Sequence, residues 1–233
     1  MSLTNIIKRA PVVIIGIPAL IGITLYTHDI FMVFFTIAGL LILNEVYRMS
    51  RPNGTEPNVW VGYLVYLSLV GDQLLGEGNN LGAVLIVSIL ILLTWEMFRK
   101  KPHVMENVAS SFFAATFVAL AMSYFISLQQ LGFNGQGGHL GGYAVLTVFI
   151  GVWTCDTMAY FIGSAIGKHK IFPRVSPNKS WEGSISGLIG SLIALVLIVR
   201  ADWLPGLDYT DALILGLITG VAGPLGDFVE SLV

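Results

Sequence analysis

The residues of this chain that could do chemistry in an apolar setting are three acidic groups in its last third. Asp156 lies within the apolar run 153–163, and Asp227 and Glu230 lie three positions apart, which places them on one side of a helix. Ionisable groups in apolar segments are expensive to bury, so each is a candidate functional group. Carboxylates are hard oxygen ligands of the kind that Mg²⁺ takes together with substrate phosphates. A cation site is therefore expected, and Asp156 could instead orient a phosphate ligand. The simpler alternatives are a structural aspartate and a polar helix end.

A stretch rich in positive charge lies between these acidic groups. Its four permanent cations are Lys168, Lys170, Arg174 and Lys179. Pro173 and Pro177 stiffen the stretch, and residues 180–183 open the next helix, whose free N–H groups attract phosphate. We therefore expect a cradle for a polyphosphate, over the alternative that the charge only marks a cytoplasmic loop.

The elements that must position these groups are unusually apolar. Of the 233 residues, 55% are hydrophobic and 11% are charged, against about 25% charged residues in an ordinary soluble domain. So few charges cannot solvate the surface of a soluble globular enzyme, and so high a hydrophobic fraction excludes a disordered chain. The net charge of −2 gives no basic field that would recruit nucleic acid, so no nucleic-acid partner is expected. The composition indicates a polytopic membrane protein.

Apolar segments of the length that crosses a bilayer, about 20 residues, recur along the chain. Eight are expected, at residues 10–27, 30–47, 58–74, 80–98, 108–131, 141–166, 183–201 and 211–233. The predicted fold is therefore all-α, a transmembrane helix bundle of about eight spans. Gly183, Gly187 and Gly190 recur at helical spacing and predict a close contact with another helix. Pro224 and Gly226 are expected to break the last span beside a cavity.

The charges of the loops predict how these spans are oriented. With eight spans, eleven of the twelve Lys and Arg residues fall at the N-terminus and in the loops 48–57, 99–107 and 167–182, and Arg200 falls on the opposite side. Because Lys and Arg accumulate in cytoplasmic loops, the N-terminus and the cation-rich loop are expected in the cytoplasm.

The acidic and basic motifs resemble those of phosphatidate cytidylyltransferase, also called CDP-diacylglycerol synthase. The resemblance is carried by Asp156-Thr157-x-Ala159-Tyr160-x-x-Gly163, Gly167-Lys168-His169-Lys170, Ser176-Pro177-x-Lys179-Ser180-Trp181-Glu182-Gly183 and Gly226-Asp227-x-x-Glu230-Ser231. We expect N-terminal transmembrane helices in residues 1–131 and a motif-bearing catalytic region in residues 132–233. The family pattern continues with further Lys, His and Asp elements where this sequence ends at Val233. The chain is therefore expected to be C-terminally truncated relative to that pattern, with little or no turnover.

The resemblance implies a membrane nucleotidyltransferase of phospholipid biosynthesis, which makes CDP-diacylglycerol and pyrophosphate from CTP and phosphatidate. It implies catalytic roles for Asp156, Lys179 and Asp227. It also implies Mg²⁺ bound by Asp227, Asp156 and Glu230, with a second, monovalent cation left open. The implied substrate ligands are Lys168, Lys170, Arg174, Ser176, Lys179, Ser180 and Glu182.

The same resemblance implies a homodimer in a bacterial inner (cytoplasmic) membrane, with CTP arriving from the cytoplasm and phosphatidate from the membrane lipid. Two other functions stay open at this stage. A transporter of a phosphorylated solute would also carry ionisable groups in its helices, but near the midplane, whereas the external half of the late helices is nearly bare here. A non-catalytic, truncated homologue is the other alternative.

Overall fold

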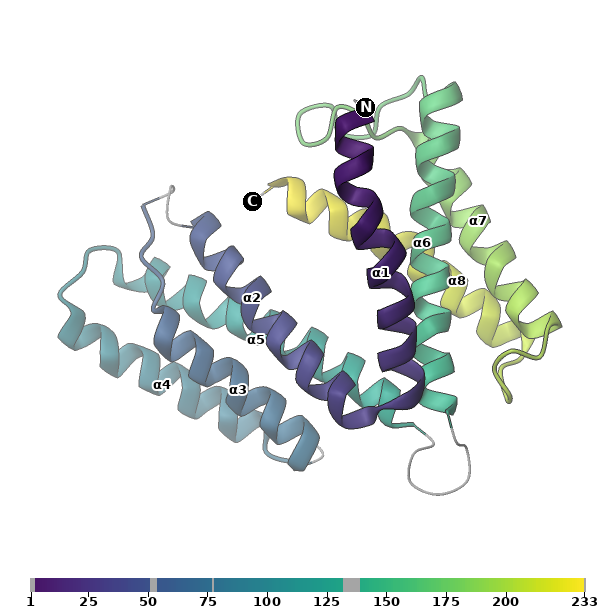
Figure 1. The fold of residues 1–233 in the computed structure, drawn as a ribbon. Coiled ribbons are helices and arrows are strands. Elements are labelled where there is room, and N and C mark those ends of the chain that lie inside the picture. The colour runs from purple at the N-terminus through teal and green to yellow at the C-terminus, as the bar shows by residue number, and fades with distance from the viewer. Residues whose placement is uncertain (1–2, 51–53, 77, 132–138, 233) are drawn as a thin grey trace. The chain divides into compact units, whose positions relative to one another are not determined.

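The chain folds almost entirely into helices (Figure 1). The computed structural model describes residues 3–50, 54–76, 78–131 and 139–232. The helices within these ranges are α1 Leu3–Tyr26, α2 His28–Ser50, α3 Val59–Leu75, α4 Leu81–Arg99, α5 Val104–Gln130, α6 Leu140–Ile166, α7 Trp181–Arg200 and α8 Tyr209–Leu232. Among the described residues the only extended pairing is one isolated bridge between Lys170 and Ser180. The prediction of an all-α chain is confirmed.

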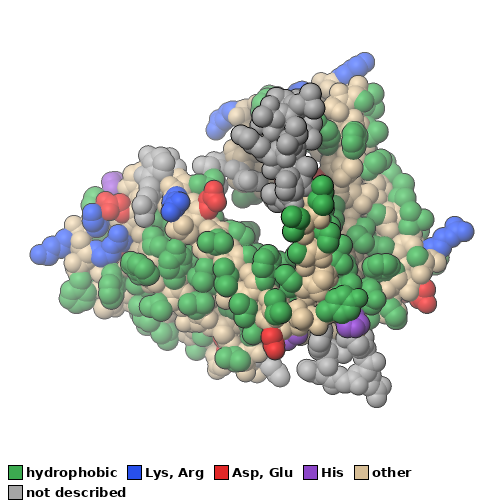
Figure 2. Space-filling model, viewed as in Figure 1, with side chains coloured by type: hydrophobic (Ala, Val, Ile, Leu, Met, Phe, Trp, Pro, Cys, Tyr) green, Lys and Arg blue, Asp and Glu red, His purple; other side chains and the backbone are tan. Residues whose placement is uncertain are grey.

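Most of these helices have the length and composition of membrane spans. Six of them, within the described residues, are long and apolar enough to cross a bilayer, namely α2, α4, α5, α6, α7 and α8. The described part of α1 and the whole of α3 are shorter apolar helices. Large hydrophobic side chains stay exposed, such as Trp60 and Leu75, and Figure 2 shows hydrophobic side chains over much of the visible surface. Apolar surface on this scale indicates contact with lipid. The chain is therefore a polytopic helical membrane protein, and its orientation stays a prediction.

The helices form two compact units. One contains α1 with α6, α7 and α8, and the other contains α2 to α5, from Thr27 to Gln130. In the first unit α1 packs against α6, where a Cβ on Gly142 would lie 2.6 Å from the carbonyl oxygen of Thr24. The helices that precede residue 132 are therefore not all in one unit, because α1 belongs with the helices that carry the motifs.

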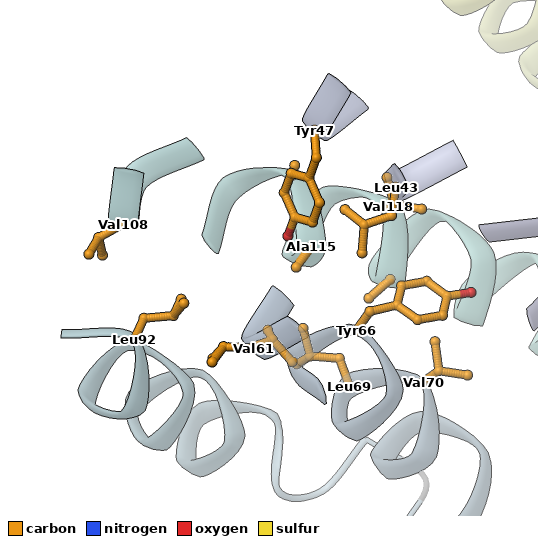
Figure 3. Packing of buried hydrophobic residues seen from close by; sticks show 13 residues of the cluster. Leu43, Tyr47, Val61, Tyr66, Leu69, Val70, Leu92, Val108, Ala115 and Val118 are labelled. Atoms are coloured by element: carbon orange, nitrogen blue, oxygen red, sulfur yellow. The ribbon is translucent and has the colours of Figure 1, made fainter. Parts of the chain in front are cut away.

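The unit of α2 to α5 has an apolar core that contains two fully buried tyrosines (Figure 3). The hydroxyl of Tyr47 donates a hydrogen bond to the carbonyl of Ser111 at 2.8 Å. The hydroxyl of Tyr66 donates to the carbonyl of Thr36 at 3.1 Å. Because both hydroxyl groups have acceptors, the large rings fill the core without burying an unpaired polar group.

Close packing through glycine joins α6 to α7 in the other unit. A Cβ on Gly183 would lie 2.9 Å from the carbonyl oxygen of Ala159, and one on Gly187 would lie 2.8 Å from that of Cys155. Gly190 is similarly crowded by a side chain of α6. The predicted contact through small residues is confirmed, and its partner is the helix that carries Asp156.

The last helix corrects one prediction. α8 runs without interruption from Tyr209 to Leu232, so the expected break at Pro224 and Gly226 is wrong. Proline has no N–H, which leaves the carbonyl four residues earlier, that of Gly220, without its helical donor. The thiol of Cys155 donates to that carbonyl at 3.7 Å in a buried position. A donor from a neighbouring helix is what allows a membrane helix to continue through proline.

We predict that Cys155→Ala destabilises the protein more than Cys155→Ser does. The alanine variant leaves the Gly220 carbonyl buried without a donor, at a cost of about 1–3 kcal/mol, whereas serine keeps a donor. Thermal unfolding of the detergent-solubilised variants measures the difference. Pro224→Ala is the control, because it supplies an N–H to Gly220, and in that background Cys155→Ala should cost less. Equal losses for alanine and serine in both backgrounds would contradict the assigned hydrogen bond.

Candidate functional site

The connection between α6 and α7 is a hairpin whose two ends are paired. We call residues 167–180 the basic hairpin. The N–H of Ile171 donates to the carbonyl of Lys179 at 3.3 Å, and the N–H of Trp181 donates to the carbonyl of His169 at 2.9 Å. These two bonds close the neck of the hairpin, so the cations that it carries stand on a defined loop.

The tip of the basic hairpin is a tight turn that carries two of the predicted phosphate ligands, Arg174 and Ser176. The N–H groups of Val175 and Ser176 donate to the carbonyl of Phe172 at 3.0 and 2.9 Å, as expected of a stretch stiffened by proline. The cations of the tip and its first arm are exposed, and they are Lys168, Lys170 and Arg174. The ammonium of Lys170 donates to a carbonyl of the opposite arm, that of Asn178, at 3.3 Å.

Ser180 fixes the start of α7. Its backbone is extended, its side chain is buried, and its hydroxyl accepts a hydrogen bond from the N–H of Gly183 at 3.2 Å, as an N-cap residue does. The end of α6 lies against this cap, because a Cβ on Gly163 would be 3.4 Å from the Ser180 hydroxyl oxygen. The described contacts of Ser180 are therefore those of a helix cap, and its contact with substrate stays a prediction.

Lys179 connects the basic hairpin to α8. Its ammonium donates to the carboxylate of Asp227 at 2.8 Å and to the carbonyl of Pro224 at 3.5 Å. The same ammonium lies 4.5 Å from the centre of the Phe228 ring, within the range of a cation–π contact. The side chain of Asp227 is about half exposed and that of Lys179 is 24% exposed, so the pair is open on one side. Of the four hairpin cations, Lys179 is the one whose described contacts reach α8.

Asp156 completes this group from α6. Its carboxylate interacts electrostatically with both Asp227 and Lys179, and its side chain is exposed within the described structure. α6 packs against both α7 and α8, and α8 is the helix that carries Asp227. The structure therefore brings together the three residues that the sequence predicts to be catalytic.

The structure describes the side chains of two of the three predicted metal ligands. The carboxylates of Asp156 and Asp227 belong to one group, and the side chain of Glu230 lies outside the described residues. Within the described residues, no three His, Cys, Asp or Glu side chains form a complete metal site. Two carboxylates still fit Mg²⁺, because this ion keeps several waters and takes one or two carboxylates together with substrate phosphates.

Glu182 lies at the neck of the basic hairpin, bonded to His169. Its carboxylate oxygens accept from the N–H of His169 at 3.2 and 3.3 Å, and one of them lies 2.6 Å from Nδ1 of the ring. The sequence predicted Glu182 as a substrate ligand and gave His169 no role. A histidine between two lysines at the start of a cation-rich loop is the signal that could have drawn attention to it.

Two aromatic residues at the site were also missed. The ring of Phe172 meets that of Phe228 edge-on, with the ring centres 5.5 Å apart and the planes at 85°. Phe228 is nearly buried, and its face holds the ammonium of Lys179. The signal in the sequence is an aromatic residue next to Asp227 and a second aromatic residue, Phe172, within the cation-rich loop. These rings attach the hairpin to α8 by apolar contact.

The fold and the site define a helical membrane protein with two carboxylates and a lysine gathered beside a cation-rich hairpin. This chain belongs to the cytidylyltransferase family, whose profile matches residues 7–233.

Curated relatives agree with this assignment. The chain is 30% identical to the phosphatidate cytidylyltransferase of Staphylococcus saprophyticus over 227 residues, which cover 94% of this chain and 79% of that one. It is 29% identical to the protein of the same name from Staphylococcus haemolyticus over 226 residues, covering 96% and 83%. For the Bacillus subtilis protein of that name the identity is 27% over 197 residues, covering 83% and 71%.

We predict that Phe228→Leu lowers the rate of cytidylyl transfer several-fold while Phe228→Tyr leaves it nearly unchanged. Leucine keeps an apolar side chain but removes the ring face under the Lys179 ammonium, an interaction of about 0.5–2 kcal/mol. Initial rates of the purified variants measure the effect. Phe98→Leu, at an exposed position of α4, is the matched control. A leucine variant as active as the wild type would show that the ring does not hold the lysine in place.

Proposed function

We propose that this protein makes CDP-diacylglycerol and pyrophosphate from CTP and phosphatidate. The observation that carries the proposal is the contact of Lys179 with Asp227 beside Asp156, at the neck of a hairpin that holds three further cations. Membership of the cytidylyltransferase family supports the reaction class, and the names of the relatives support phosphatidate as the acceptor.

The reaction is a phosphoryl-type displacement that needs positioning more than covalent chemistry. A phosphate oxygen of phosphatidate attacks the α-phosphorus of CTP, a new P–O bond forms, and the bond to the β-phosphate oxygen breaks. That oxygen keeps the bonding electron pair and leaves as part of pyrophosphate. Lys179 would neutralise charge at the transferring group, while the exposed cations Lys168, Lys170 and Arg174 would hold the remaining phosphates.

A divalent metal is the second source of positive charge in this proposal. Asp227 and Asp156 would hold Mg²⁺, with Glu230 as a further predicted ligand. When bound, the metal neutralises charge on the phosphates and orients them for in-line attack. The packing of α6 against α8 keeps the two aspartates in position. The expectation of a second, monovalent cation is based on the family resemblance alone.

We further propose that the reaction takes place at the cytoplasmic face of a bacterial inner membrane. The cation-rich hairpin is on the side that the loop charges assign to the cytoplasm, where CTP is available. Phosphatidate would enter from the adjoining leaflet of the membrane. A homodimer is expected on the resemblance alone. Family membership makes the transporter and the non-catalytic homologue less favoured alternatives.

We predict that the purified full-length protein converts labelled CTP and phosphatidate to labelled CDP-diacylglycerol in the presence of Mg²⁺. Asp227→Ala and Asp156→Ala should each lower the rate on the order of 10²-fold or more, as expected when a group that stabilises transition-state charge is removed. Thin-layer separation of the lipid product measures the rate. Asp29→Ala, at an exposed position at the start of α2, is the control. The assignment fails if the full-length protein forms no such lipid from any phosphatidate supplied.

A metal requirement is a separate prediction. Chelation of divalent ions should abolish the activity, and addition of Mg²⁺ should restore it. Asp227→Asn should raise the Mg²⁺ concentration for half-maximal rate, because an amide oxygen is a weaker ligand than a carboxylate for a hard cation. Titration of the rate against Mg²⁺ at saturating CTP measures the shift. An unchanged titration in the Asp227→Asn variant would exclude Asp227 as a metal ligand.

A further inference from the structure

Glu182 makes contacts that differ from those of a substrate ligand. Both of its carboxylate oxygens accept from the backbone N–H of His169, at 3.2 and 3.3 Å, and one lies 2.6 Å from Nδ1 of the same residue. The side chain of Glu182 is 24% exposed, whereas that of His169 is 79% exposed. The carboxylate is thus directed at the hairpin's own backbone and is largely covered there.

A direct role with CTP would also be unfavourable on electrostatic grounds. The triphosphate is strongly anionic, and an unprotonated carboxylate in contact with it would add repulsion unless a cation lay between them. A carboxylate near the phosphates needs another reason to be there. Bonding to N–H groups of the hairpin supplies that reason, because it satisfies both the carboxylate and the donors.

The bonds around His169 form a closed unit at the neck. The N–H and ring of His169 bond to Glu182, and its carbonyl accepts from the N–H of Trp181, the residue just before Glu182. Further along the arms, the N–H of Ile171 donates to the carbonyl of Lys179. His169 is therefore held from both sides of its peptide, and the register of the two arms is fixed.

This register determines where Lys179 stands. Its carbonyl is bonded across the neck to Ile171, while its ammonium reaches Asp227 at 2.8 Å. A shift of the neck by one residue, or its opening, would move the Lys179 ammonium away from Asp227. Misplacement of a reacting group by about 1 Å can cost on the order of 10²-fold in rate.

We propose that Glu182 is a positioning residue, which closes the neck of the basic hairpin through His169 and thereby holds Lys179 at Asp227. This inference rests on the proposed nucleotidyl transfer and gives Glu182 a role within it other than contact with CTP. In this inference, His169 is the residue of the opposite arm to which the Glu182 carboxylate bonds.

Kinetics of four variants test the inference. Glu182→Ala should lower kcat about 10- to 100-fold with a smaller change in the KM for CTP, because the variant moves Lys179 away from Asp227 but removes none of the exposed cations that would bind the phosphates. Glu182→Gln keeps an acceptor for the His169 N–H and should retain most of the rate. His169→Ala removes only the ring bond and should fall between them. Because both act through one contact, Glu182→Ala combined with His169→Ala should be no slower than Glu182→Ala alone. Multiplicative losses in the double variant, or a raised KM with unchanged kcat, would overturn the inference.

Hydrogen exchange of the substrate-free protein gives a readout that does not depend on activity. Opening of the neck in Glu182→Ala should speed exchange of the Ile171 and Trp181 amides at least about 10-fold. Glu106→Ala is the matched control, since Glu106 also pairs with a histidine at 3.5 Å, but that histidine is His103, just before the start of α5. Unchanged exchange at Ile171 and Trp181 would overturn the positioning role even if the enzyme is active. A full-length protein with a protected neck but no lipid product would instead overturn the proposed function.

Discussion

The ion pair between Lys179 and Asp227 is the contact on which the candidate site depends. It joins the basic hairpin to α8, and Asp156 of α6 interacts with the charge of both partners. Partly exposed ion pairs contribute little to stability, typically between about 0 and 1 kcal/mol. The ion pair therefore forms because other contacts keep the basic hairpin and α8 in place. Those contacts are the packing of the helices, the hydrogen bonds at the neck of the hairpin and the aromatic contact of Phe228.

Three kinds of interaction keep the basic hairpin and α8 in place, and each suits its surroundings. Within the helices, glycines such as Gly183 and Gly187 let α6 and α7 approach to backbone contact, which gives van der Waals attraction where lipid offers no hydrophobic driving force. At the neck, outside the apolar run, hydrogen bonds to Glu182 and across the arms take over. Between hairpin and α8, the rings of Phe172 and Phe228 meet edge-on, and the Phe228 ring lies against the ammonium of Lys179.

The sequence predicts the fold and the membership of the site well, because both depend on patterns along the chain. Apolar segments of spanning length predicted the helices, and ionisable residues in apolar runs pointed to Asp156 and Asp227. The cation-rich loop and the family resemblance pointed to Lys179, and the structure groups the three residues. The predicted break at Pro224 was wrong, because no pattern in the sequence of α8 reveals that a thiol of α6 donates a hydrogen bond to the Gly220 carbonyl. The pairing of Glu182 with His169 escaped prediction for the same reason: a partner thirteen residues away across a loop is a matter of geometry.

The burial of Cys155 has a practical consequence. It is the one cysteine of the chain, its side chain is fully shielded, and its sulfur faces a carbonyl inside the packed helices. Thiol-reactive dyes and spin labels therefore have no accessible native target. A reporter cysteine introduced at an exposed hairpin position, for example by Arg174→Cys, would take up label selectively in the otherwise unmodified protein, so the mobility of the hairpin could be recorded without first removing the native thiol.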